Sequence, residues 1–301
     1  AADPAAGITP AAESAALTVT TQEPPAAAVA SGKPLYILNS GGTAPEFAIT
    51  DTTAYLPMKF GATLLATKID FATAQQQVLC SADGCSHVDA GCPAFMAADD
   101  DALSQYYTGG LVAAGDRLYW FINGGASPVN VRVDVSALDG SNRHTIVENS
   151  SIFQLDCTMS MCFTDGDALY LATAASSLVR LDDTGLTSVF PLNDGHPTPE
   201  NPLYTQDNTP RCTILGCWQD MAVFACTPSL SGSGTGLIGV HADGSVTDLG
   251  SYSIDFGSPT DWISTLHDGK LYYVSGSGDQ AEPIEVTDLA AQTTETLPLP
   301  A

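Results

Sequence analysis

The sequence predicts an all-β fold, a β-propeller of four-stranded blades, from three observations. Apolar and polar residues alternate in many stretches after Lys33, as in residues 131–135, while helical periodicity is almost absent. Asp-Gly pairs, which favour tight hairpin turns, separate several of these stretches. A polar turn followed by an apolar strand with an aromatic residue recurs about every 50 residues, a length typical of a propeller blade.

The repeat sets the predicted number of blades. Its clearest copies are residues 115–120, 166–171 and 268–273, and weaker copies surround Tyr55 and Val223. The marks of the repeat are Tyr55, Tyr119, Tyr170, Val223 and Tyr272. Complete sets of strands give five blades, beginning near residues 46, 94, 152, 211 and 261. A closed ring is expected because closure removes exposed strand edges.

The strand at residues 35–38 is left over from this count. It could cover a sheet edge, close the ring or belong to a sixth blade. Five blades are therefore the prediction, and six are the alternative.

One unit carries a resemblance to a known family. Residues 115–120 (GDRLYW), 133–135 (VDV) and 138–143 (LDGSNR) together resemble a YWTD repeat of the low-density-lipoprotein-receptor propeller class and its bacterial relatives. The other units match in part, and Phe121-Ile122 stands where the Thr-Asp half of the signature belongs. The resemblance implies a propeller with a binding role and carries over no catalytic residue.

Composition points to an exported protein with an N-terminal tether. Residues 1–32 are rich in Ala, Pro and Thr and lack aromatic and basic residues, so we expect a flexible tether ahead of a single propeller domain at 33–301. A net charge of −25 excludes nucleic acid as a partner. No apolar run is long enough to span a membrane. We expect an extracellular or cell-envelope monomer, its signal peptide removed, with a lipid anchor upstream as one option.

The even number of cysteines predicts disulfide bonds outside the cytosol. A hairpin centred on Gln219 would place Cys212 opposite Cys226, and an Asp-Gly turn would allow a local bridge between Cys80 and Cys85. The predicted disulfide cysteines are Cys80, Cys85, Cys92, Cys157, Cys162, Cys212, Cys217 and Cys226.

Zinc is the competing interpretation of one cysteine group. Cys80, Cys85, His87 and Cys92 lie close together in the sequence, and three Cys with one His could hold zinc tetrahedrally. Their spacing matches no zinc motif, and an oxidising compartment converts thiolates to disulfides first. The prediction is therefore disulfides, with no metal and no cofactor.

No motif predicts a catalytic residue. Gly232-Ser233-Gly234 lacks the strand and helix of a nucleophile elbow, and Asp99–Asp101 indicates a solvated acidic loop rather than a calcium site. All five histidines are expected at the surface. The candidate ligand-binding residues lie near the innermost strands or the long segment at 86–109; they are Tyr106, Tyr107, Asp156, Trp218, Asp261 and Trp262.

These observations favour a non-enzymatic binding or interaction module for an unknown protein, peptide or glycan. The alternative is a secreted hydrolase or lyase acting on carbohydrate, with carboxylates such as Asp156 and Asp261 at the propeller channel. A purely structural role is a third option.

Overall fold

The fold is seen in a computed structural model of the chain. It describes residues 32–40, 47–61, 63–80, 82–88, 90–98, 110–123, 131–150, 159–173, 178–190, 211–227, 235–252, 264–274 and 283–297. Within these residues every regular element is a β-strand, which confirms the all-β prediction. The described residues form no helix of the length and apolarity that a membrane span requires.

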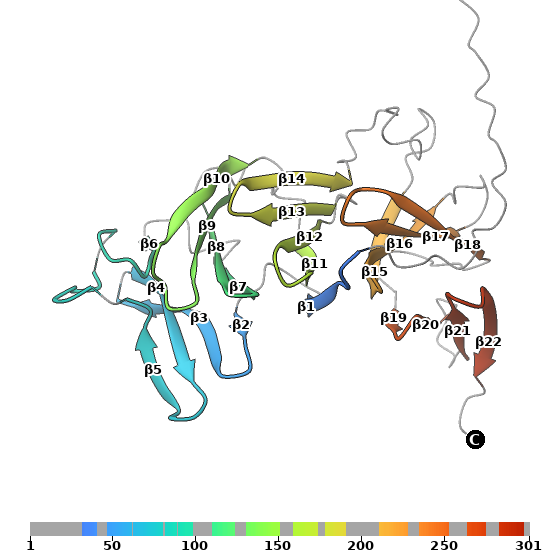
Figure 1. Cartoon of the computed structure of the whole chain (residues 1–301). Coiled ribbons are helices and arrows are strands. Elements are labelled where there is room, and N and C mark those ends of the chain that lie inside the picture. The colour runs from blue at the N-terminus through green and yellow to red at the C-terminus, as the bar shows by residue number, and fades with distance from the viewer. Residues whose placement is uncertain are drawn as a thin grey trace, which may run out of the picture.

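Five antiparallel sheets follow one another along the chain (Figure 1). The first contains β2 (Ala48–Ile49), β3 (Thr53–Phe60), β4 (Thr63–Asp70), β5 (Gln75–Val78) and β6 (Phe95–Ala98). The second contains β7 (Gly110–Ala114), β8 (Arg117–Asn123), β9 (Val131–Ala137) and β10 (His144–Ser150). The third contains β1 (Tyr36–Ser40), β11 (Met159–Thr164), β12 (Leu169–Thr173), β13 (Leu178–Asp182) and β14 (Gly185–Phe190).

The last two sheets repeat the same meander. The fourth contains β15 (Arg211–Trp218), β16 (Met221–Thr227), β17 (Thr235–His241) and β18 (Val246–Tyr252). The fifth contains β19 (Ser264–His267), β20 (Lys270–Val274), β21 (Ile284–Asp288) and β22 (Thr293–Leu297).

The sheets confirm the repeat of four antiparallel strands. Each mark of the repeat lies in the second meander strand of its sheet, namely Tyr55 in β3, Tyr119 in β8, Tyr170 in β12, Val223 in β16 and Tyr272 in β20. One boundary was wrong. The second unit does not begin near residue 94, because β6 pairs with β4 of the first sheet instead of opening the second.

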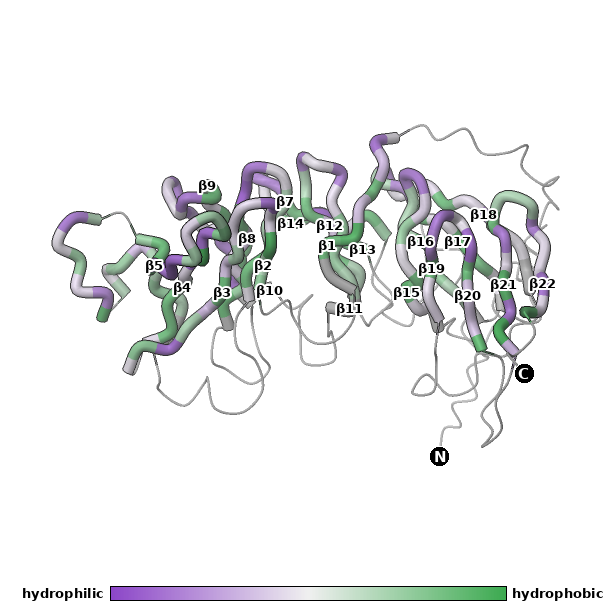
Figure 2. Tube along the Cα trace, turned by 90° about the horizontal axis from the view of Figure 1, so that it is seen from below, coloured by the Kyte–Doolittle hydropathy of each residue, from purple (hydrophilic) through white to green (hydrophobic). Residues whose placement is uncertain are grey.

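Closure into a ring is not seen in the described part of the chain. The sheets stand in a row in chain order, and the first and the fifth lie at its opposite ends in two perpendicular views (Figures 1 and 2). No described strand joins these two sheets.

The strand left over from the repeat has a defined place. β1 pairs antiparallel with β11, so it extends the third sheet beyond the first strand of its meander. Leu35 is buried, and its amide donates to the carbonyl of Gln219 in the fourth sheet at 2.8 Å. The Gly32 amide donates to the carboxylate of Asp220 at 2.8 Å. The described N-terminal segment therefore bridges two sheets.

The apolar core lies between neighbouring sheets, because their strands bury both faces. In β8, Tyr119 and Phe121 point into the cluster shared with the third sheet, whereas Leu118 and Trp120 point into the cluster shared with the first. This alternation follows from the two-residue period of a strand. Similar clusters fill the junctions between the third and fourth and between the fourth and fifth sheets.

Glycines in hairpin turns let adjacent sheets approach closely. A Cβ added to Gly115, in the turn between β7 and β8, would lie 2.4 Å from the carbonyl oxygen of Gly166 in the third sheet. A Cβ on Gly244, in the fourth sheet, would lie 2.6 Å from the carbonyl oxygen of Val189 in the third. These turns have no room for a side chain, because backbone atoms of the next sheet occupy it.

The Gly115 turn gives a test of this packing with a matched control. Gly115 and Gly61 share a φ of 60°, but a Cβ on Gly61 would meet nothing within 4 Å. Gly61→Ala should therefore cost only the left-handed backbone penalty, about 1 kcal/mol. Gly115→Ala adds a clash with backbone and should cost about 3 kcal/mol. Urea unfolding measures the free energy of unfolding of both variants. Equal losses of this free energy would contradict close packing at the Gly115 turn.

Candidate functional site

The predicted ligand-binding residues are not gathered by the described part of the structure. Tyr106, Tyr107, Asp156, Asp261 and Trp262 lie outside the described residues, as does the acidic run 99–101. Trp218 ends β15 and packs against the core between the fourth and fifth sheets.

The surroundings of Trp218 explain its position. A Cβ added to Gly269, in the turn between β19 and β20, would lie 2.7 Å from the Trp218 Nε1 atom. The indole thus covers the turn of the next sheet and contributes to packing.

A different cluster stands out, at an interruption of the first sheet. β5 and β6 both pair with β4, β5 with residues 67–70 and β6 with residues 63–65, so they share one edge of that strand. Ala66 lies between the two halves: its carbonyl accepts from the Leu79 amide at 2.9 Å, and its amide donates to the Ala94 carbonyl at 2.8 Å. Residues 79–94 therefore form a loop that leaves the sheet edge and returns to it.

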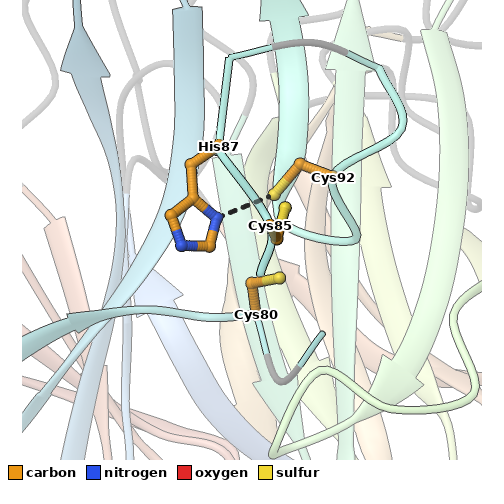
Figure 3. Close-up of side chains that lie close together, drawn as sticks. All are labelled: Cys80, Cys85, His87 and Cys92. Atoms are coloured by element: carbon orange, nitrogen blue, oxygen red, sulfur yellow. Dashed lines mark hydrogen bonds between the residues drawn. The ribbon is translucent and has the colours of Figure 1, made fainter. Parts of the chain in front are cut away.

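This loop brings together the side chains of Cys80, Cys85, His87 and Cys92 (Figure 3). Their three sulfurs and one imidazole nitrogen lie within 4.8 Å of one another. The Nδ1 atom of His87 faces the Cys92 sulfur at 3.3 Å. A tetrahedral zinc site with bonds of about 2.3 Å to sulfur spaces its sulfurs by about 3.8 Å, so these donors have the number, type and spacing for such an ion.

Local turns in the loop direct these side chains toward one another. The Cys85 amide donates to the Ala82 carbonyl at 3.3 Å and closes a turn that has left-handed backbone at Gly84 (φ 71°). His87, two residues after Cys85, also has left-handed backbone (φ 58°). At the other end, the Cys92 carbonyl accepts from the Phe95 amide at 2.9 Å as β6 begins. The chain therefore folds back on itself between the first two cysteines and the third.

The cluster is partly sheltered from water. Cys92 is buried, with 4% of its surface exposed, while Cys80, Cys85 and His87 are half-buried. Burial, together with contacts to Cys85 and Cys80, raises the pKa of the Cys92 thiol to about 12. Without a bound cation Cys92 is accordingly a neutral thiol at physiological pH.

Arg143, from the second sheet, clamps the returning end of the loop. Its Nη1 atom donates to the carbonyls of Pro93 at 2.8 Å and Phe95 at 2.7 Å. Its Nε donates to the Asp134 carboxylate at 2.9 Å, and its guanidinium lies 4.0 Å from the ring centroid of Trp120. Burial lowers the pKa of Arg143, and the charge of Asp134 opposes this effect.

This network was not foreseen, although its residues belong to the unit that resembles a YWTD repeat. Trp120, Asp134 and Arg143 were singled out as parts of a motif. Their convergence requires the pairing of β8 with β9, which places Trp120 opposite Asp134. Sequence spacing alone does not show that the same arginine reaches a loop of the first sheet.

The other cysteines fall into two groups. Cys226 is disulfide-bonded, and the β15–β16 register places Cys212 directly opposite it, as the hairpin centred on Gln219 predicted. Cys162 and Cys217 are free thiols, and the Cys217 sulfur donates to the Leu35 carbonyl at 3.2 Å. Cys157 lies outside the described residues. Cross-linking of all eight cysteines stays a prediction.

Two histidines are not the surface residues that the sequence suggested. His87 belongs to the cysteine cluster, and the His241 side chain is only 14% exposed. His241 joins the Asp220 carboxylate at 3.2 Å through Nδ1 and the Thr247 hydroxyl at 2.9 Å through Nε2. Asp220 also accepts from the Gly32 amide, so this hydrogen-bonded chain braces the fourth sheet and the N-terminal segment.

Comparisons with known proteins give no family. No family model matches the chain, and no curated protein matches it. Similar solved structures include an oligogalacturonate lyase in complex with manganese, at 13% identity over 83% of this chain and 63% of the lyase, with a TM-score of 0.46. TolB from Acinetobacter baumannii is 12% identical over 89% of this chain and 55% of TolB, with a TM-score of 0.36.

A chain of a nidogen/laminin complex is 11% identical over 85% of this chain and 78% of that one, with a TM-score of 0.35. The chain spans less than two thirds of the length of the lyase and of TolB. At these identities and scores the likeness carries no conclusion about activity. The resemblance to the YWTD class stays a prediction.

The Arg143 clamp can be tested against a second arginine on the same carboxylate. Arg143 is 12% exposed and Asp134 5%, whereas Arg132, which also pairs with Asp134, is 43% exposed. Arg143→Met removes the more buried of the two arginines that pair with the buried Asp134 carboxylate, and should lower the free energy of unfolding by about 3 kcal/mol. Arg132→Met should cost less than about 1 kcal/mol. Urea unfolding measures the free energy of unfolding of both variants. A larger loss of this free energy for Arg132→Met would refute the clamp.

Cys162 gives a test through pH. Burial raises the pKa of this thiol, 1% exposed, to about 12. Its folded pKa exceeds the unfolded value, so its contribution to stability is complete below about pH 8.5 and is lost as pH rises toward 12. Cys162→Ala should make the alkaline loss of stability shallower by up to about 1.4 kcal/mol per pH unit between roughly pH 9 and 11. Equal slopes would instead indicate the predicted disulfide at Cys162.

Proposed function

We propose that this chain is an extracytoplasmic binding module, a β-propeller whose five sheets are its blades and whose ligand is a protein or peptide. In this proposal the propeller comprises residues 33–301 and functions as a monomer. The tether at 1–32 either holds it at the cell envelope or belongs to a freely secreted protein. The observation that carries the proposal is the exposed apolar strand β1 at the edge of the third sheet, next to β11.

β1 presents apolar side chains where most strands in this protein bury them. Tyr36, Ile37 and Leu38 are 59%, 41% and 38% exposed. A register shift between Ile37 and Asn39 breaks the regular alternation of the pairing with β11. Consecutive exposed apolar residues on a strand that is anchored at Leu35 are typical of a contact surface rather than of a solvated edge.

The position of β1 suits ligand binding. It extends the sheet beyond β11, the first meander strand of the third sheet, and first strands line the central axis of a propeller. A protein segment fits this surface better than a sugar, because the exposed apolar side chains of Tyr36, Ile37 and Leu38 can contact the apolar residues of a peptide. The net charge of −25 favours a basic partner.

Closure of the ring is supported by what the end sheets expose. Ile49 (61%) and Phe60 (45%) of the first sheet and Ile284 (39%) and Leu297 (37%) of the fifth are exposed, and the last two are register partners. Packing these sheets against each other would bury all four. The alternative function, a carbohydrate hydrolase or lyase, gains no support here because Asp156 and Asp261 lie outside the described residues.

The proposal is tested by probing peptide and glycan arrays with the full chain, and by assaying the chain for turnover of a panel of polysaccharides. We expect binding to basic, apolar peptides, weakened at least about tenfold by Tyr36→Ser with Leu38→Ser, as loss of an aromatic anchor usually does. Val246→Ser, on an equally exposed apolar residue of the fourth sheet, is the control and should bind as wild type. Turnover of a polysaccharide, binding only to glycans, or full peptide binding by the double variant would each overturn the proposal.

A further inference from the structure

We propose that Cys80, Cys85, His87 and Cys92 bind one zinc ion, which fastens the loop 79–94 to the first sheet. The inference is independent of the ligand proposed for β1 and concerns a different sheet. It reverses the expectation from the sequence that these cysteines form disulfides and that no metal is bound.

The first argument is convergence. Four donor atoms from a loop whose described residues form no helix or strand lie within 4.8 Å of one another, and all four side chains point toward a common centre (Figure 3). Each belongs to a residue type that binds zinc, and three sulfurs with one imidazole nitrogen are a known structural set. Four protein ligands complete a tetrahedron, which leaves no open position and indicates a structural ion rather than a catalytic one.

The second argument is that disulfides serve this cluster poorly. It holds three cysteines, so one internal disulfide would leave a third thiol and the facing imidazole unused. Cys80 and Cys92 are free thiols in the structure, although their sulfurs lie within 4.8 Å. A zinc ion instead uses every donor, including the Nδ1 atom of His87, held toward Cys92 by left-handed backbone.

The third argument is charge. Three thiolates around a dication leave one net negative charge, which needs a cation nearby. Arg143 lies there, because its guanidinium is fixed by the carbonyls of Pro93 and Phe95, on either side of Ala94. Asp134 pairs with both Arg143 and Arg132, so this group of three side chains keeps one net positive charge. Such outer contacts orient metal ligands and tune the site.

The fourth argument concerns the part of the sheet that a bound ion would stabilise. The loop interrupts the edge strand of the first sheet. Its ends are held by backbone bonds around Ala66, and its returning end also by Arg143. The Thr63 hydroxyl adds one contact, to the Val88 carbonyl at 3.2 Å. An ion that joins Cys80, just after β5, to Cys92, just before β6, would lock the two half-strands into one edge.

Metal content of the full chain tests the proposal. The protein is produced under reducing conditions, loaded with zinc, and washed with a weak chelator and salt to strip ions from its acidic surface. We expect one zinc per chain by mass spectrometry of the metal. Replacement by Co²⁺ should give thiolate-to-cobalt charge-transfer bands, which carboxylates cannot produce. Chelation with a strong chelator should lower the melting temperature.

Variants locate the ion. Cys85→Ser and His87→Asn should each weaken zinc binding at least about 100-fold, since they remove a ligand outright. Cys217→Ser is the matched control, a half-buried thiol outside the cluster, and should keep one zinc. His87→Asn keeps all cysteines and suits left-handed backbone, so it separates loss of metal from loss of fold.

Three outcomes would overturn the proposal. The reduced chain could hold no zinc after the wash, the cobalt form could lack charge-transfer bands, or the ligand variants could retain zinc as tightly as the control. Isolation of the natural exported protein with a disulfide among Cys80, Cys85 and Cys92 and no metal would also refute it.

Discussion

The structure depends on sheets whose strands are apolar on both faces. Tyr119 and Trp120 are adjacent in β8, yet both side chains are fully buried, one toward the third sheet and the other toward the first. A sheet of this kind is unstable alone and must be covered on each side by another. The order of sheets along the chain, the close turns at Gly115 and Gly244, and the bridging segment that contains Leu35 all serve this covering.

The sequence was sufficient for the repeat because that information is local. An aromatic or apolar strand after a polar turn marks the second meander strand of each sheet, and alternation with a period of two fixes which residues face each neighbour. The place of the leftover strand β1 and the boundary near residue 94 could not be predicted from local sequence in this way. β6 pairs with a strand of the preceding unit, and β1, which was assigned to none of the five units, covers the edge strand β11 of the third sheet. Such pairing is decided by packing between segments far apart in the sequence.

The candidate site was less predictable for the same reason. Spacing showed that Cys80, Cys85, His87 and Cys92 were near in sequence, but an extended chain would have kept their side chains apart. Their convergence depends on left-handed backbone at His87 and on β5 and β6 sharing one edge of β4. Arg143 comes from another sheet. Trp218, in contrast, was singled out from the sequence as a candidate ligand-binding residue. Its position is better explained by packing over Gly269.

Both unusual features of this fold follow from one difficulty, the open edge of a sheet. Backbone groups and apolar side chains at an edge must be paired or covered. The first sheet has an interrupted edge strand, and β5 is largely exposed. Its loop is held by Arg143 instead of a continuous ladder, and it brings together four side chains of types that bind zinc. The third sheet has β1 at one edge, where Tyr36 is exposed and Leu35 is buried. In our two proposals, a zinc ion fixes the edge of the first sheet, and the apolar side chains of β1 bind a partner.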